Sequence, residues 1–205
     1  MINFKRIQNR KGFTTVELMI AVSLTLLFAA SFYGAFATMG SEMWRKKANF
    51  DTNVSAKNVM DRMSRDVEEA VSVVASYGGN TTGTNCLILK LPSIDASGVP
   101  TSITNQFDYV TYKINPTDST QLLRTLVVLN GSQREGGSNI TNAVVARKVN
   151  ALSLSYGGTA LSSVSSATIP TMKTINVQIT AQGTTLGTNQ RTQVDSDLML
   201  RNNIS

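Results

Sequence analysis

The sequence predicts an α+β protein in which a long N-terminal helix packs on an antiparallel β-sheet. Three observations lead to this class. An apolar run near the N-terminus is long enough to cross a membrane, the stretch after it has helical periodicity, and the rest alternates apolar and polar residues in short runs. We expect a leader at residues 1–12, an apolar helix at 13–39, an amphipathic continuation at 40–76 and a globular β-sheet domain at 77–205.

The leader is basic, since it carries Lys5, Arg6, Arg10 and Lys11 and no acidic residue. Short segments rich in Lys and Arg stay in the cytoplasm, so this leader orients the chain with its C-terminal part exported. The whole chain has 19 basic and 13 acidic side chains, and without the four leader cations 15 basic side chains remain, a net charge of +2. A basic nucleic-acid surface is therefore not expected.

Residues 13–39 contain no Lys, Arg, Asp, Asn, Gln or Pro, and Glu17 is their only charged residue. About 20 such residues span the core of a bilayer as a helix, so the run predicts a transmembrane segment. A cleaved secretory signal has an apolar region of roughly 7 to 15 residues, followed by a cleavage site between small residues. Here the run is longer, and the candidate site Ala29-Ala30-Ser31 lies inside it.

Glu17 is the residue that a plain membrane anchor does not explain. An acid in the apolar part of a membrane helix costs roughly 2.5 to 3.5 kcal/mol on insertion scales, so Glu17 needs a partner. Cleavage between Gly12 and Phe13 would create an α-amine at Phe13, one helical turn from Glu17 or on a neighbouring copy. The positive charge of this amine could pair with the Glu17 carboxylate, which gives a physical reason to connect the cleavage site with the acid.

Residues Gly12, Phe13, Thr14, Glu17 and Leu18 resemble the prepilin signal of the type IV pilins and pseudopilins, a basic leader followed by Gly, Phe and a Glu at the fifth mature position. The resemblance implies that a membrane-embedded prepilin peptidase cuts after Gly12 and methylates the amine of Phe13. It also implies that the apolar helix moves from the membrane into the core of a helical filament. There Glu17 would pair with the N-terminus of a neighbouring subunit and set the register.

The stretch after the apolar run continues as a helix, because neither Pro nor a Gly-rich break interrupts it. One apolar stripe recurs with spacings of 4, 3, 4, 3 and 4, at Ala56, Met60, Met63, Val67, Ala70 and Val74. Between these positions lie three i,i+4 pairs, which are Asp61 with Arg65, Arg62 with Asp66, and Arg65 with Glu69. We expect the stripe to pack on the protein's own sheet. The charged pairs are expected to support a solvated helix face weakly.

The C-terminal part of the sequence predicts β-strands separated by Gly- and Ser-rich loops. The predicted strands are residues 86–91, 109–114, 122–129, 144–149, 151–156 as a continuation of 144–149, 175–182 and 192–200. Together with the amphipathic stripe they predict one domain with a single antiparallel sheet laid on the helix.

The residue types argue against an enzyme. The chain has no histidine, which excludes Ser-His and Cys-His nucleophile pairs and histidine-bound metals. Cys86 is the only cysteine, so no intramolecular disulfide forms, and it is expected to be a small core residue, with an intermolecular bridge as the alternative. Asp195 and Asp197 point the same way on a predicted strand and could serve as acid and base or as calcium ligands, but no third acid lies near them in the sequence. We expect no catalytic activity, no cofactor and no metal.

The C-terminal half resembles the J-type pseudopilin of type II secretion and the PilW-type minor pilin. The residues that carry this similarity are 60–66 (MDRMSRD), 145–156 (VARKVNALSLSY), 174–179 (TINVQI) and Leu200-Arg201-Asn202. The lone Cys86 departs from the disulfide-closed loop of many major pilins. The resemblance implies a structural subunit, a minor pilin or pseudopilin, that helps initiate and assemble a type IV pilus or a type II secretion pseudopilus.

The same resemblance implies the partners and the location. The partners are the prepilin peptidase, other pilins or pseudopilins, the inner-membrane assembly platform and the membrane itself. Before assembly the chain would cross the inner membrane once, with the leader cytoplasmic and the C-terminal domain periplasmic; afterwards it would lie in the pilus or pseudopilus. Two alternatives stay open: a major, adhesive or DNA-uptake pilus subunit, and a signal-anchored periplasmic domain.

Overall fold

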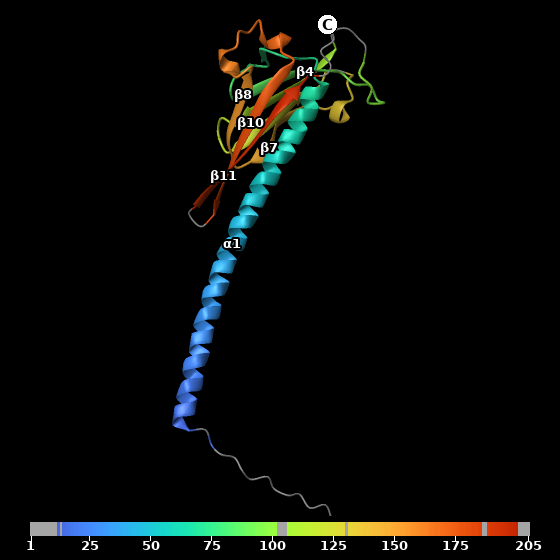
Figure 1. Ribbon diagram of the computed structural model, residues 1–205. Helices are drawn as coiled ribbons and strands as arrows, with labels where there is room; N and C mark the ends of the chain where they lie inside the picture. Colours follow the sequence, from blue (N-terminus) through green and yellow to red (C-terminus); the bar gives the residue numbers. More distant parts are fainter. Residues whose placement is uncertain (1–11, 13, 102–105, 130, 186–187, 201–205) are drawn as a thin grey trace, which may run out of the picture. The chain divides into compact units, whose positions relative to one another are not determined.

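The computed structural model describes residues 12, 14–101, 106–129, 131–185 and 188–200 (Figure 1). Its elements are the long helix α1 (Thr15–Glu69), antiparallel strands and short 3-10 turns, so the α+β class is confirmed. The chain forms two compact units, Met1–Arg45 and Lys46–Ser205, and α1 contributes to both.

The N-terminal unit is the apolar part of α1, whose large apolar side chains, among them Leu18, Phe28 and Phe36, are exposed. By length and composition the helix can cross a membrane. Its hydroxyl groups donate to backbone oxygens within the helix: Ser23 to Met19, Thr25 to Ala21, Ser31 to Leu27, and Thr38 to Gly34. These polar groups therefore have partners even where no water reaches them.

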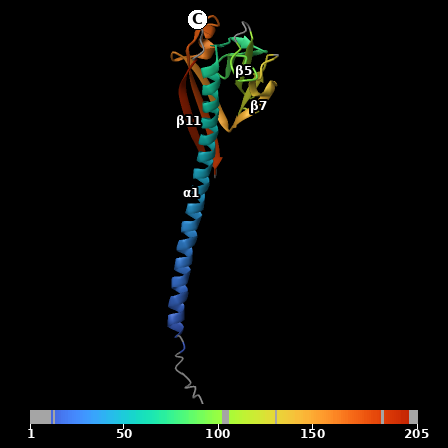
Figure 2. The same ribbon diagram turned by 90° about the vertical axis from the view of Figure 1, so that its right-hand side faces the viewer.

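In the second unit, one face of α1 is buried as the periodicity predicts. The buried residues of the helix are Thr52, Ala56, Val59, Met60, Met63, Asp66 and Val67. The apolar residues among them share one hydrophobic core with residues of both sheets, for example Leu89, Leu126, Leu152 and Ile179. This part of the helix has β11 on one side and β5 and β7 on the other (Figure 2).

The helix is shorter than the predicted amphipathic segment 40–76, because α1 ends at Glu69 and β1 (Ser72–Val73) follows at once. The backbone N–H of Val71 donates to the oxygen of Lys90, and that of Val74 donates to the oxygen of Ile88. Val71, Val73 and Val74 are β-branched residues, which suit a strand better than a helix. Consequently Val73, and not the predicted Val74, is the buried valine.

The strands form two main sheets and one small hairpin. The five-stranded sheet has the order β1-β4-β5-β6-β7, with β4 (Cys86–Pro92), β5 (Phe107–Ile114), β6 (Gln121–Val127) and β7 (Ile140–Arg147). The four-stranded sheet has the order β11-β10-β8-β9, with β8 (Val149–Tyr156), β9 (Thr159–Ala160), β10 (Thr174–Thr185) and β11 (Thr188–Met199). The hairpin pairs β2 (Ser76–Tyr77) with β3 (Asn80–Thr81). The turns are η1 (Arg134–Gly136), η2 (Leu161–Ser163) and η3 (Ile169–Thr171).

The prediction of a single sheet, in which residues 151–156 continue 144–149, is wrong. Lys148 has a φ of 62°, a left-handed conformation that interrupts an extended strand. The strand before it, β7, pairs with β6, whereas the strand after it, β8, pairs with β10. The apolar alternation continues through this bend, so the pattern of residues did not reveal that the chain changes sheets.

Gly183 on β10 lies against the helix. A Cβ atom at this position would lie 2.9 Å from the Thr52 Oγ1 and 3.6 Å from the Ala48 backbone oxygen. We expect Gly183→Ala to lower the free energy of unfolding by roughly 1 to 3 kcal/mol, as overpacking does. Adding Thr52→Ala removes the contacting atom, so the double variant should recover part of the lost free energy of unfolding. The measurement is urea unfolding of the two single variants and the double variant. If the effects of Gly183→Ala and Thr52→Ala on the free energy of unfolding simply add in the double variant, the two residues are not in contact.

Candidate functional site

The first candidate site is the start of α1, where Thr14 and Glu17 bond to each other reciprocally. The Thr14 backbone N–H and hydroxyl donate to the Glu17 carboxylate at 2.9 and 3.0 Å. In return the Glu17 N–H donates to the Thr14 hydroxyl oxygen at 3.3 Å. This is a capping box, which satisfies backbone groups that the first helical turn leaves free. The carboxylate therefore has a local partner that the sequence argument did not consider.

The predicted cleavage site lies directly before this cap. Gly12 is exposed, and a Cβ atom built on it would meet no heavy atom of the described chain within 4 Å. Phe13, the predicted methylation site, lies outside the described residues. A side chain at Gly12 is thus compatible with the folded chain, so the effect of a substitution there reports on processing.

The second candidate site is a network of charged residues between the last turns of α1 and the five-stranded sheet. Asp66 on α1 accepts hydrogen bonds from the Tyr112 hydroxyl at 2.5 Å and from the Arg124 Nε at 3.0 Å. The Arg124 Nη2 also lies 2.9 Å from Glu135, which the Arg62 Nη2 contacts at 2.8 Å. The Arg124 side chain is only 2% exposed, so this is a buried ion pair.

A second arginine, Arg134, makes a similar set of contacts, and its partner on α1, Glu69, lies about one helical turn after Asp66. Arg134 in η1 lies 2.6 Å from Glu69 on α1 and 3.1 Å from the fully buried Asp108 on β5. Its third contact is a hydrogen bond of 2.9 Å to the Pro92 backbone oxygen. Asp108 also accepts from the hydroxyls of Ser132 and Ser93 and from the Leu129 N–H. The guanidinium therefore ties the helix end to β4 and β5.

These contacts change the role of the charged residues predicted for a solvated helix face. Arg62 pairs with Glu135, Asp66 with Arg124, and Glu69 with Arg134, all of them partners far along the chain. The Arg65 Nε donates to the Asp61 backbone oxygen, not to its carboxylate. The interpretation of Asp66 as a solubilising residue is wrong, because Asp66 is buried, whereas Glu69 remains exposed beside Arg134. The periodicity of a helix shows which residues share a face but not what that face meets.

Glu135 holds its place in the network in a strained conformation. Its φ and ψ are 47° and 40°, a left-handed conformation that is uncommon for a residue with a side chain. Strain of this kind costs about 1 to 3 kcal/mol and persists where surrounding contacts demand it. Here those contacts are the two guanidinium groups of Arg62 and Arg124.

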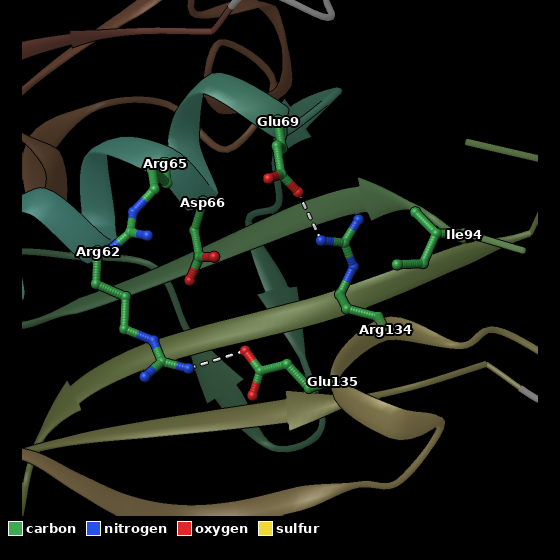
Figure 3. Close-up of a pocket in the computed structure, with 7 residues that line it drawn as sticks. All are labelled: Arg62, Arg65, Asp66, Glu69, Ile94, Arg134 and Glu135. Carbon is green, nitrogen blue, oxygen red and sulfur yellow. Dashed lines mark hydrogen bonds and ion pairs between the residues drawn. The ribbon is translucent and has the colours of Figure 1, made fainter. Parts of the chain in front are cut away.

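The network borders an open groove of about 440 Å³ (Figure 3). Its lining residues are Arg62, Arg65, Asp66, Glu69, Ile94, Arg134 and Glu135. Among the described residues no buried side-chain nitrogen or oxygen is left without a hydrogen bond. The buried acids and guanidinium groups of the network bond to one another, so the arrangement fastens α1 to the sheet.

The sequence analysis missed Tyr112, Arg124, Asp108 and Arg134. One signal was present: Arg124 stands inside the apolar run 122–129, where a solvated arginine is not expected. A charged residue in such a run indicates a buried partner of opposite charge. The identity of that partner, Asp66, depends on long-range packing.

Tyr112 supplies a test of the buried network by pH. Burial, the negative charge of Asp66 and the hydrogen bond to it raise the pKa of the Tyr112 hydroxyl well above its ordinary value of 10.0. Above pH 10 the unfolded chain loses the proton of the Tyr112 hydroxyl, while the folded chain keeps it. The free energy of unfolding should therefore fall by up to about 1.4 kcal/mol per pH unit above pH 10, and remain unaffected by this group below it.

The measurement is urea unfolding of the full chain in detergent between pH 8 and 12. In Tyr112→Phe the free energy of unfolding should decline less steeply with pH than in the wild type, and the difference in slope should correspond to about one proton. The matched control is Tyr33→Phe on the exposed helix, which should retain the wild-type slope. An unchanged slope in Tyr112→Phe would show that the hydroxyl is not held neutral by Asp66.

Other candidates for chemistry are weaker. Cys86 is half-buried, and burial raises the pKa of its thiol, so the reactive thiolate is disfavoured. Asp195 and Asp197 are exposed on β11, as predicted, and Asp197 accepts a hydrogen bond of 3.0 Å from Asn176. Within the part of the chain that the structure describes, no three His, Cys, Asp or Glu residues lie together as a metal site would require.

The two candidate sites differ in kind. The start of α1 presents an acid next to an accessible Gly12, whereas the buried network is structural. Comparison of the chain with protein-family models, with curated proteins and with solved structures finds no match.

Proposed function

We propose that this chain is a minor pilin or pseudopilin, a non-enzymatic subunit that helps initiate and assemble a type IV pilus or type II secretion pseudopilus. The observation that carries the proposal is the combination of Gly12, Phe13 and Glu17 at the start of an exposed apolar helix. Cleavage after Gly12 and methylation of Phe13 precede assembly. Glu17 then pairs with the N-terminus of a neighbouring subunit in the filament.

The apolar side chains of α1 support the proposal because they have two possible environments, lipid and the helices of other subunits. Met19, Ile20, Ser23, Leu24 and Leu27 line a shallow, mainly apolar groove of about 340 Å³ along the helix. Such a surface is unfavourable in water, since each buried CH₂ group contributes about 0.8 kcal/mol. Transfer from the membrane into a bundle of like helices keeps it buried throughout.

A second candidate function is a periplasmic domain held by an uncleaved signal anchor. The capping box favours it, because the bonds from Thr14 give Glu17 a role inside a single chain. The two functions differ in the mature N-terminus. A processed pilin begins at Phe13 with a methylated amine, whereas an uncleaved anchor begins at Met1. Mass spectrometry of membrane and sheared-filament fractions distinguishes them.

Substitution of Gly12 tests the cleavage site. We expect Gly12→Leu to accumulate as a membrane-bound precursor that retains the leader, because a bulky residue at the cut site hinders the peptidase. Since open space surrounds Gly12, the substitution leaves the fold intact. Gly12→Ala, which adds only a methyl group, is the graded control. A Gly12→Leu protein that is shortened as the wild type is would show that Gly12 does not determine cleavage.

A further inference from the structure

The helix changes character just after the apolar run ends. Met43 and Trp44 are 64% and 62% exposed, and Trp44 is the only tryptophan of the chain. Arg45 follows, and then Lys46 and Lys47, both exposed. Arg45 pairs with Glu42 at 3.4 Å in a solvent-exposed contact. Residues 43–47 therefore place an aromatic ring and three cations next to one another on the helix.

The distance along the helix places this segment at a membrane surface. From Thr15 to Trp44 the helix rises about 44 Å, at 1.5 Å per residue. A bilayer with its headgroups is about 40 to 45 Å thick. When the capped start of α1 lies at one headgroup layer, Trp44 lies at the other. Glu17 is then close to the first surface and not in the middle of the hydrocarbon.

The three cations oppose the orientation that the leader imposes. Lys and Arg residues close to the exported end of a membrane helix weaken the orientation signal of a basic leader. Their presence therefore calls for a role other than topology. Trp is enriched where headgroups meet hydrocarbon, and Lys or Arg near an anionic membrane surface contributes about 1 kcal/mol per side chain.

We propose that residues 43–47 are an interfacial anchor that binds the headgroups of anionic phospholipids in the leaflet on the exported side. The inference rests on the proposed membrane insertion of α1 before assembly. Trp44 inserts at the level of the headgroups, while Arg45, Lys46 and Lys47 contact their phosphates. The anchor fixes the depth of the helix in the membrane, and its contacts must break when the helix leaves the bilayer.

The test uses Trp44 as the native fluorophore of the full chain reconstituted in vesicles. Brominated phosphatidylglycerol and brominated phosphatidylcholine, compared at equal mole fraction, quench a tryptophan that they touch. We expect stronger quenching by the anionic lipid, with a relative binding constant that falls by up to about fivefold for each cation removed. The variant is Lys46→Gln/Lys47→Gln, and Lys57→Gln, an exposed lysine further along α1, is the matched control. High salt should reduce the preference, because the Debye length shortens.

The outcomes separate this anchor from the membrane insertion on which it rests. A second reporter, Phe28→Trp in a Trp44→Phe background, lies in the middle of the apolar run. Two results together support the anchor. The deep reporter is quenched, and Trp44 shows a preference for the anionic lipid that is lost when Lys46 and Lys47 are changed but not when Lys57 is changed. Quenching of the deep reporter without any anionic preference at Trp44 overturns the anchor alone. A deep reporter that neither lipid quenches overturns the membrane insertion as well.

Discussion

Replacing Arg124 with Met should lower the free energy of unfolding by about 3 to 5 kcal/mol, the usual cost of removing one partner from a buried ion pair. The Arg124 guanidinium lies 3.0 Å from Asp66 and 2.9 Å from Glu135. Without it the Asp66 carboxylate stays in a site that is largely closed to water, with the Tyr112 hydroxyl as its remaining side-chain donor. The last turns of α1 would then separate more easily from β6.

The measurement is urea unfolding of the full chain in detergent, followed by far-UV circular dichroism. Arg147→Met on the exposed part of β7 is the matched control and should change stability by less than about 0.5 kcal/mol. The triple variant Asp66→Leu/Tyr112→Phe/Arg124→Met removes the charges and the hydroxyl together, and should recover much of the loss. A small effect of Arg124→Met alone would mean that water enters the network and solvates Asp66.

Replacing Glu17 with Gln should abolish filament assembly while leaving the helix and the removal of the leader intact. Gln at this position still accepts from Thr14, as capping boxes allow, so only the negative charge is lost. Truncating one partner of a buried charge pair at an interface costs about 2 to 5 kcal/mol, enough to weaken each subunit contact more than tenfold. The reciprocal variant Thr14→Ala weakens the cap but keeps the charge.

The two variants are compared in the native host by counting filaments and by the mass of the mature protein. Under the pilin proposal, Glu17→Gln lowers filament number sharply, whereas Thr14→Ala retains most filaments. If capping is the real role of Glu17, the order reverses, because Thr14→Ala removes the hydroxyl that the cap needs. Normal filament numbers in Glu17→Gln would remove the main support for the filament function.

The sequence predicted the helix stripe and the longer strands of the second unit because their signals are local. The stripe Ala56, Met60, Met63 and Val67 is buried as its spacing indicated, and β4, β5 and β10 cover the predicted strands. Helical and strand periodicities arise from backbone geometry, so neighbouring residues suffice to identify them. The same reasoning identified the apolar half of α1, whose length and composition suit a membrane.

Tertiary structure alone decided where these elements meet. The bend at Lys148 divides the strands between two sheets, although the residues around it alternate as in one continuous strand. Gly183 matters only because Thr52 lies against it.

The charges show the same division between sequence and tertiary structure. The sequence by itself determined that Asp66 and Glu69 lie on a helix, but their partners Arg124 and Arg134 lie 58 and 65 residues further along the chain. An ion pair depends on distance in space and on exclusion of water. Neither quantity is encoded in the spacing of residues along a helix, so only packing of α1 against the sheet turned a charged helix face into a buried network.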